Sequence, residues 1–218
     1  ITREKLIALR DMGVNRISIN PQTMQQKTLD LIGRKHTVED ICNSFKLARE
    51  VGFTNINMDF IIGLNGETLS DIKDSFTKVK FFSPESITIH SLALKRAARL
   101  NTENKREIMD NDLMLSMIDV ATETCNELGL KPYYLYRQKN MAGNLENIGF
   151  SKPGKECLYN ILIMEEKQTI IACGAGTSSK IVFNDGRIER IENVKDPKLY
   201  IERLDEMIER KENMHGID

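Results

Sequence analysis

Strands alternate with helices three times in the first hundred residues, and this repeat constrains the fold more than any other sequence feature. Gly33, Gly52 and Pro84 follow three of the helices as stop signals, and Thr23 and Gln26 have the spacing of a capping box. The predicted strands cover 16–20, 55–62 and 86–91, and the predicted helices cover 2–12, 23–31, 37–50 and 68–82. This alternation indicates βαβ units and a parallel sheet.

Each of these strands is apolar on one side and polar on the other, because successive side chains point to opposite faces of a sheet. The polar sides hold Ser18, Asn20, Asn57, Asp59, Thr88 and His90. Strands that are buried on both faces usually read as continuous apolar runs. We therefore expect helices over the apolar face and a wet or occupied cavity on the polar face. A wide or incomplete α/β barrel fits this pattern better than a tightly packed eight-stranded barrel.

The pattern changes near residue 101, so we predict a partial (β/α) barrel over 1–100 and a smaller α+β domain over 101–218. A long helix is expected at 108–128. The β-like runs after it cover 132–137, 158–164, 169–173, 180–183 and 187–191. The last two runs should form a hairpin, and a final helix should begin at Pro197 and continue to about residue 211.

The composition favours a cytoplasmic globular protein. Lys and Arg number 31 against 32 Asp and Glu, so the charge balance gives no reason to expect nucleic acid or an anionic membrane as a partner. No apolar run approaches the roughly 18 residues of a membrane span, and no secretory pattern opens the chain. The cysteines lie far apart without a Cys-x-x-Cys pair, which favours free structural thiols over a disulfide framework or metal site.

Three polar residues stand where ligands bind in α/β sheets, at the carboxyl ends of strands or just beyond them. Gln22 follows the first strand, Asp59 lies on the polar side of the second, and Arg34 follows a short helix. Each also has a structural explanation: Gln22 as a loop residue, Asp59 as a paired buried acid, and Arg34 as a charge that the helix dipole favours.

Three blocks around these residues resemble the oxygen-independent coproporphyrinogen III oxidase family of radical S-adenosylmethionine (SAM) enzymes. The blocks are 13–23 (GVNRISINPQT), 32–37 (IGRKHT) and 52–68 (GFTNINMDFIIGLNGET). Further on, 152–160 (KPGKECLYN) and 174–179 (GAGTSS) are similar to the family's C-terminal blocks, and 132–144 (PYYLYRQKNMAGN) is most similar to the HemZ-type coproporphyrinogen dehydrogenases. The resemblance implies a radical-SAM-type partial barrel.

The resemblance also implies cofactors and roles. Gln22 and Asp59 would hold the SAM ribose and its surroundings, Arg34 would pair with the SAM carboxylate, and the backbone near Ala93 would touch SAM. A reduced [4Fe-4S] cluster would pass one electron to SAM. The resulting deoxyadenosyl radical would take a hydrogen atom from a propionate of the porphyrinogen substrate, and decarboxylation would leave a vinyl group. In such enzymes the protein's own part is to position SAM and exclude competing reactions.

The cluster motif of this family, Cys-x-x-x-Cys-x-x-Cys, does not occur in the sequence. We expect it upstream of Ile1, so that the chain by itself would be an inactive fragment. An uncovered strand edge would then favour self-association. Two other functions remain open: a haem-binding or haem-delivery protein with the same fold, and an α/β scaffold without a cofactor.

Weaker candidates lie in the second half of the chain. Residues 174–179 could form an anion-binding nest or a plain turn. The aromatic and basic residues of 133–139 could meet a porphyrin ring and its propionates, although strand alternation explains them equally well. His36, His90 and His215 do not cluster in sequence.

Overall fold

The computed structural model describes residues 1–92, 111–136 and 147–212. The chain divides into two compact units, which we call the N-terminal unit (Ile1–Glu156) and the C-terminal unit (Cys157–Asp218). The domain boundary expected near residue 101 falls among residues outside the described ranges and stays a prediction. No helix in the described part of the chain is both long and apolar enough to cross a bilayer.

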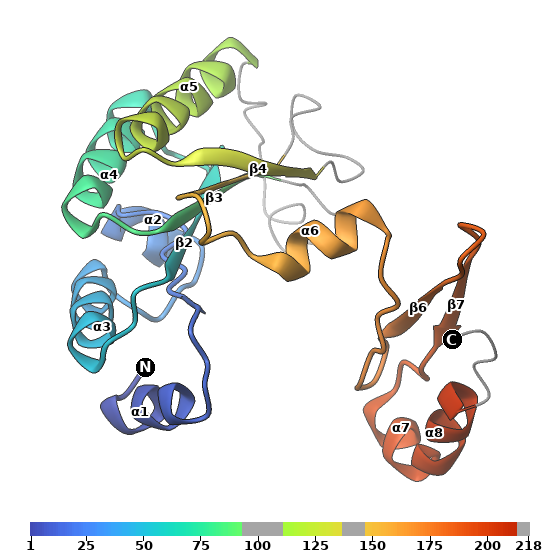
Figure 1. Ribbon diagram of the computed structural model, residues 1–218. Coiled ribbons are helices and arrows are strands. Elements are labelled where there is room, and N and C mark those ends of the chain that lie inside the picture. The colour runs from blue at the N-terminus through green and yellow to red at the C-terminus, as the bar shows by residue number, and fades with distance from the viewer. Residues whose placement is uncertain (93–110, 137–146, 213–218) are drawn as a thin grey trace. The chain divides into compact units, whose positions relative to one another are not determined.

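The N-terminal unit combines a five-stranded sheet with helices (Figure 1). Its helices are α1 (Arg3–Asp11), α2 (Gln26–Leu31), α3 (Val38–Val51), α4 (Leu69–Phe82) and α5 (Asn111–Glu127). Its strands are β1 (Ile17–Ser18), β2 (Ile56–Ile62), β3 (Ser86–Ser91), β4 (Lys131–Tyr136) and β5 (Asn147–Ser151). The spatial order is β1-β2-β3-β5-β4. The first three strands are parallel, as predicted, and β5 and β4 extend the sheet with antiparallel pairs.

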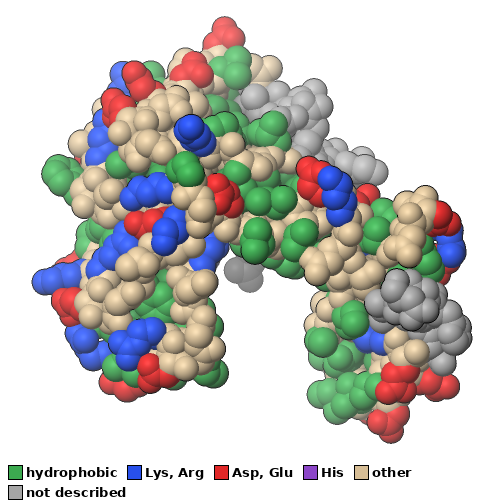
Figure 2. All heavy atoms as spheres, in the orientation of Figure 1, with side chains coloured by type: hydrophobic (Ala, Val, Ile, Leu, Met, Phe, Trp, Pro, Cys, Tyr) green, Lys and Arg blue, Asp and Glu red, His purple; other side chains and the backbone are tan. Residues whose placement is uncertain are grey.

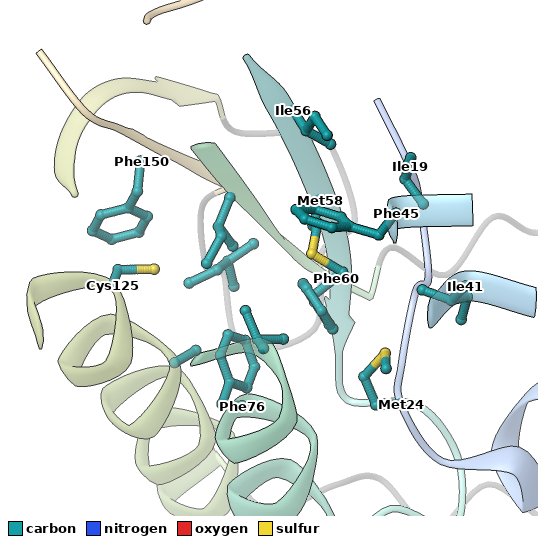
Figure 3. Close-up of a cluster of buried hydrophobic side chains, with 14 of the residues drawn as sticks. Ile19, Met24, Ile41, Phe45, Ile56, Met58, Phe60, Phe76, Cys125 and Phe150 are labelled. Carbon is teal, nitrogen blue, oxygen red and sulfur yellow. The ribbon is translucent and has the colours of Figure 1, made fainter. Parts of the chain in front are cut away.

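The apolar side of the sheet packs under helices, as expected. Ile56, Met58 and Phe60 of β2 are at most 1% exposed and point toward side chains of the helices (Figure 3). The Phe60 ring lies 5.0 Å from that of Phe76 on α4. Cys125 on α5 is also fully buried in this core. Burial of large apolar side chains is the main stabilising contribution to such a unit.

Local signals explain where the longer helices begin. The hydroxyls of Thr37 and Thr68 each accept a hydrogen bond from the backbone amide three residues on. The carboxylates of Asp40 and Asp71 accept from the backbone amides of these two threonines, so both helices start with capping boxes. The predicted capping box of the first short helix is wrong. Helix α2 begins later, at Gln26, and Thr23 instead donates its hydroxyl to a carboxylate in another loop.

The C-terminal unit holds α6 (Leu158–Glu165), β6 (Ser178–Val182), β7 (Ile188–Glu192), α7 (Pro197–Glu202) and α8 (Leu204–Glu212). The predicted hairpin is confirmed, because β6 and β7 pair antiparallel. The predicted final helix is interrupted at Arg203 and forms α7 and α8. Asp196 caps α7 as expected, since its side chain accepts from the Leu199 amide at 3.0 Å.

Three predictions for the second half are wrong. Residues 158–164 form helix α6, because a short apolar run does not distinguish a strand from a helix by periodicity. Residues 169–173 contribute only an isolated bridge at Ile170. Strand β5 was not predicted: Ile148 and Phe150 alternate with Asn147, Gly149 and Ser151, and Asn and Gly have low strand propensity.

Charge is distributed over the surface without a dominant sign. Figure 2 shows Lys and Arg side chains interspersed with Asp and Glu on the visible face of the N-terminal unit. Many of these charges form exposed ion pairs, including Arg3 with Glu50 and Lys78 with Asp74. Pairs of this kind contribute little to stability.

Candidate functional site

The polar side of the sheet carries a hydrogen-bonded network centred on Asn57. Its Nδ2 donates to Asp59 Oδ1 at 2.6 Å and to Ser18 Oγ at 3.2 Å, and its Oδ1 accepts from Thr88 Oγ1 at 3.3 Å. Asn57 and Thr88 are 3% and 4% exposed. Polar groups buried to this degree are stable when they are bonded to one another. The network orients Asp59, whose carboxylate is only partly buried.

Gln22 connects the end of the first strand to Asp59. Its backbone amide donates to the Asp59 carbonyl at 3.0 Å, and its carbonyl accepts from the Ile61 amide at 2.9 Å. Gln22 has φ 69°, a left-handed conformation that is unfavourable for a residue with a side chain. Such a conformation persists where the surroundings enforce it, and it is enriched at functional sites. The buried Gln22 side chain also donates to the Asn20 carbonyl at 3.4 Å.

Arg34 lies just beyond the end of α2. Gly33 adopts φ 71°, and the Arg34 amide donates to the Leu29 carbonyl at 2.9 Å, which closes the helix. The Arg34 side chain is exposed and makes no ion pair within the described residues. The structure therefore joins the backbones of Gln22 and Asp59 directly, whereas no hydrogen bond or ion pair among the described residues joins Arg34 to either of them. Ala93, the fourth predicted residue, lies outside the described ranges.

Glu67 is a residue of this region that sequence reasoning missed. It is 4% exposed, and its Oε1 accepts a 2.5 Å hydrogen bond from Thr23 Oγ1. The second carboxyl oxygen is buried without a hydrogen-bond partner among the described residues. Burial raises the pKa of Glu67, although the Thr23 hydroxyl opposes this effect. Glu67 thereby ties the loop after β2 to the residue that follows Gln22.

Glycines shape the same loop. Gly63 has φ 90°, and a Cβ there would lie 2.7 Å from Met114 Sδ on α5. Gly66 has φ 78° directly before Glu67. The sequence feature that could have pointed to Glu67 was therefore its position directly after Gly66, in the loop that follows β2.

At the amino-terminal ends of β2 and β3, Glu85 holds three segments together. Its carboxylate pairs with Arg49 at 2.8 Å and with Lys152 at 3.4 Å, and it accepts the Ile56 amide at 3.0 Å. Burial opposes ionisation of Glu85, but the hydrogen bond from Arg49 and the bond from the Ile56 backbone together lower its pKa. Lys152, in a block resembling the family's C-terminal motifs, therefore has a structural role.

The residues of this chain do not fit an iron–sulfur cluster. Within the described ranges, no group of three or more His, Cys, Asp or Glu is arranged to hold a metal ion. The cysteines are free and lie on separate segments: Cys42, Cys125, Cys157 and Cys173. Burial raises the pKa of Cys125 to about 12, so this thiol is protonated near neutral pH.

The loop at residues 174–179 is organised as a turn, because its amides are used within the unit. The Gly174 amide donates to the Tyr200 hydroxyl at 3.1 Å, and the Gly176 amide donates to the Val194 carbonyl at 2.8 Å. Asn193 Nδ2 donates to the Gly174 carbonyl at 2.9 Å and to Thr177 Oγ1 at 3.0 Å. With these donors occupied, the turn alternative is favoured over an anion-binding nest.

Comparisons with known proteins identify the class. Residues 1–79 match the Radical SAM superfamily. The chain also has the fold of a solved structure, coproporphyrinogen III oxidase (HemN) from Escherichia coli, with a TM-score of 0.70. The sequences are 18% identical, and the alignment covers 94% of this chain and 46% of that chain. Residues 1–79 therefore match the radical SAM family model, and the predicted α/β fold of radical-SAM type is confirmed.

Sequence relatives define the branch. The chain is 46% identical to the oxygen-independent coproporphyrinogen-III oxidase-like protein HemZ of Bacillus subtilis, over 97% of this chain and 42% of that protein. It is 28% identical to the heme chaperone HemW of the same organism, over 83% of this chain and 45% of that protein. The chain thus spans less than half the length of these two relatives. The resemblance to the coproporphyrinogen oxidase family is confirmed, with HemZ-type proteins among its relatives.

Proposed function

We propose that the chain is part of a radical SAM enzyme that converts propionate side chains of coproporphyrinogen III to vinyl groups. The relatives carry the family assignment, and the contact between Gln22 and Asp59 carries the site. Gln22 lies just beyond β1, and Asp59 lies in the middle of the neighbouring parallel strand β2. Ligands of α/β sheets bind at the carboxyl ends of the strands, where Gln22 is located.

The residues at this site suit SAM. The Asp59 carboxylate accepts one hydrogen bond from Asn57, and its Oδ2 makes none within the described residues, so it is able to accept from a ribose hydroxyl. The Gln22 side-chain amide carries donors and an acceptor, and its Nε2 donates to the Asn20 carbonyl. The exposed Arg34 guanidinium matches the SAM carboxylate in shape and charge. Bound SAM supplies the radical chemistry, and these residues position it.

Calorimetric titration of SAM tests the site. The protein at its full natural length should bind SAM, and Asp59→Ala should weaken binding by about tenfold or more, since hydrogen bonds to a charged group contribute about 1.5–3 kcal/mol. Asp11→Ala, a substitution of an exposed aspartate, is the matched control and should leave the affinity unchanged. Indistinguishable heats for wild type and Asp59→Ala would contradict the site.

A second candidate function, haem binding or delivery, is favoured by the similarity to heme chaperones. Anaerobic incubation of the full-length, cluster-reconstituted protein with coproporphyrinogen III, and in a parallel sample with haem, separates the two functions. Vinyl products together with deoxyadenosine support the oxidase. Stoichiometric retention of haem without either product supports the chaperone and rules the oxidase out.

Two further proposals concern the 218-residue chain by itself. We expect it to assemble no iron–sulfur cluster, because its cysteines lie on separate segments, and iron and sulfide analysis after anaerobic reconstitution checks this. We also expect it to self-associate, since among the described strands β1 pairs only with β2 and forms an edge of the sheet. A sedimentation profile with only monomer at high concentration would contradict the second expectation.

A further inference from the structure

Strand β4 contains an irregularity that places two neighbouring tyrosine side chains on the same face of the sheet. Its register with β5 shifts between Pro132 and Tyr134, so that Tyr133 is the extra residue of a β-bulge. Adjacent residues of a regular strand point to opposite faces. Here the two rings instead lie together, with centroids 4.9 Å apart and planes inclined at 64°.

Gly149 on β5 provides the space that the rings occupy. A Cβ at this position would lie 1.9 Å from Tyr134 Cε1 and 3.0 Å from Tyr133 Cε1. Gly149 does not have a positive φ, so its backbone conformation does not require glycine. The requirement comes from the tyrosine rings, which both reach the face of the sheet on which a Gly149 side chain would stand.

That face is the one that carries Asp59. Asp59 pairs with Thr88, Thr88 with Gly149, and Gly149 with Tyr134, so these four residues form one row across the sheet. Paired residues of neighbouring strands project to the same side. Strands are about 4.8 Å apart, so the row spans roughly 14 Å between the Asp59 and Tyr134 backbones. The Tyr134 ring covers Gly149 and thus lies one strand closer to Asp59.

A purely structural explanation accounts for part of this arrangement. An aromatic ring that covers a cross-strand glycine stabilises a sheet, and this would explain Tyr134 alone. It does not explain why a bulge turns Tyr133 onto the same face. Bulges that redirect a side chain are enriched beside active sites. Both tyrosines are partly exposed.

We propose that Tyr133 and Tyr134 form a contact surface for the tetrapyrrole ring, at the opposite end of the row from the SAM site. This inference rests on the proposed function, because it places the substrate beside the SAM held at Asp59. Aromatic side chains bind flat ring systems through face and edge contacts, and the pyrrole rings of the substrate offer both. The pair would set specificity by excluding substrates that lack a large ring.

Gly149→Ala tests the inference, because it displaces the tyrosine rings and removes no side chain. Coproporphyrin III and hemin serve as the two probes, titrated by absorbance and fluorescence into the protein at its full natural length. We expect Gly149→Ala and Tyr134→Ala each to weaken binding about tenfold. Tyr134→Phe keeps the ring and should stay within about twofold of wild type.

Two controls separate binding from stability. Phe150→Leu alters the neighbouring residue of β5, which lies in the apolar core on the other face, and it should leave both affinities unchanged while lowering stability. SAM titration of every variant should give the wild-type affinity, since Asp59 is untouched. If Gly149→Ala fails to fold, Tyr133→Leu with Tyr134→Ala provides the same comparison.

The outcomes distinguish the two levels of the proposal. Weakened binding of both probes supports a shared tetrapyrrole surface, and weakened binding of hemin alone supports it for a haem-delivery protein. Wild-type binding of both probes by Gly149→Ala and Tyr134→Ala would overturn the tyrosine surface and leave the SAM site standing. Loss of SAM binding and tetrapyrrole binding in the wild type itself would overturn the proposed function.

Discussion

The N-terminal unit buries a continuous apolar core between its sheet and helices, whereas the C-terminal unit buries few apolar side chains. Among the described residues of the C-terminal unit, the buried apolar ones are Ile181 and Met207. Helices α6 and α7 have no buried residue. Figure 2 shows apolar side chains gathered on the surface of this unit, and Ile201 on α7 is 73% exposed.

Hydrogen bonds of a buried polar side chain link several segments of the C-terminal unit. Asn193 is 4% exposed and bonds to Gly174 and Thr177 through Nδ2, while its Oδ1 accepts from Lys211 Nζ at 2.8 Å. One side chain thus links the turn, the end of the hairpin and α8. The difference teaches that a small unit with little apolar burial relies on directional bonds, which stabilise less per group than a packed core.

The largest effect is expected from the core of the N-terminal unit. Phe76→Ala should lower the free energy of unfolding by about 3–5 kcal/mol, because it removes a buried ring and leaves a cavity. Phe81 lies on the same helix at 86% exposure, so Phe81→Ala is the matched control and should stay within about 0.5 kcal/mol of wild type. Urea denaturation measures both, and equal losses would break the comparison.

An intermediate effect is expected from the C-terminal unit. Asn193→Ala should destabilise by about 1–3 kcal/mol, since it removes a buried side chain and leaves its partly buried partners without these hydrogen bonds. Hydrogen exchange of the Gly174 and Gly176 amides should rise with it. Asn184→Ala, at the exposed hairpin turn, should change neither quantity. If Asn193→Ala had no effect, apolar burial would have to stabilise this unit after all.

The smallest effect is expected from the titration of Glu67 in the N-terminal unit. Because burial raises the pKa of Glu67 in the folded state, the unfolded chain releases this proton first as the pH rises. Stability should therefore fall above the ordinary glutamate pKa of 4.5 and level off once the pH passes the raised value. Glu67→Gln should remove this fall, by about 1.4 kcal/mol for each unit of the pKa difference.

A variant of Glu85, a glutamate whose pKa is shifted in the opposite direction, is the control. The pKa of Glu85 is lowered, despite its burial, by Arg49 and the Ile56 amide. Its contribution to stability is present above the unfolded pKa and is lost as the pH falls through the lower folded value. Glu85→Gln should therefore reduce the acid sensitivity that Glu67→Gln leaves in place. The free energy of unfolding is measured from pH 3 to 8. The same pH dependence for wild type and Glu67→Gln would contradict the assignment.

Much of the N-terminal half could be predicted from the sequence. Alternation in 55–62 and 86–91 was sufficient for β2 and β3, and the capping residues Thr37 and Thr68 marked two helices. Gln22 and Asp59 were selected from their positions on the predicted strands, the family motifs implied their roles, and a backbone contact joins them in the structure. The roles of Gln22, Arg34, Asp59 and Ala93 in SAM binding stay predictions.

The sequence by itself determined the alternation of strands and helices, the polar and apolar sides of β2 and β3, and the radical SAM resemblance, because these depend on local periodicity and short motifs. Tertiary structure alone decided the partner of Thr23, the helical state of α6 and the convergence of Tyr133 and Tyr134 on Gly149. Each of these depends on which distant segment fills the neighbouring space, and contacts between distant segments leave no local pattern in the chain.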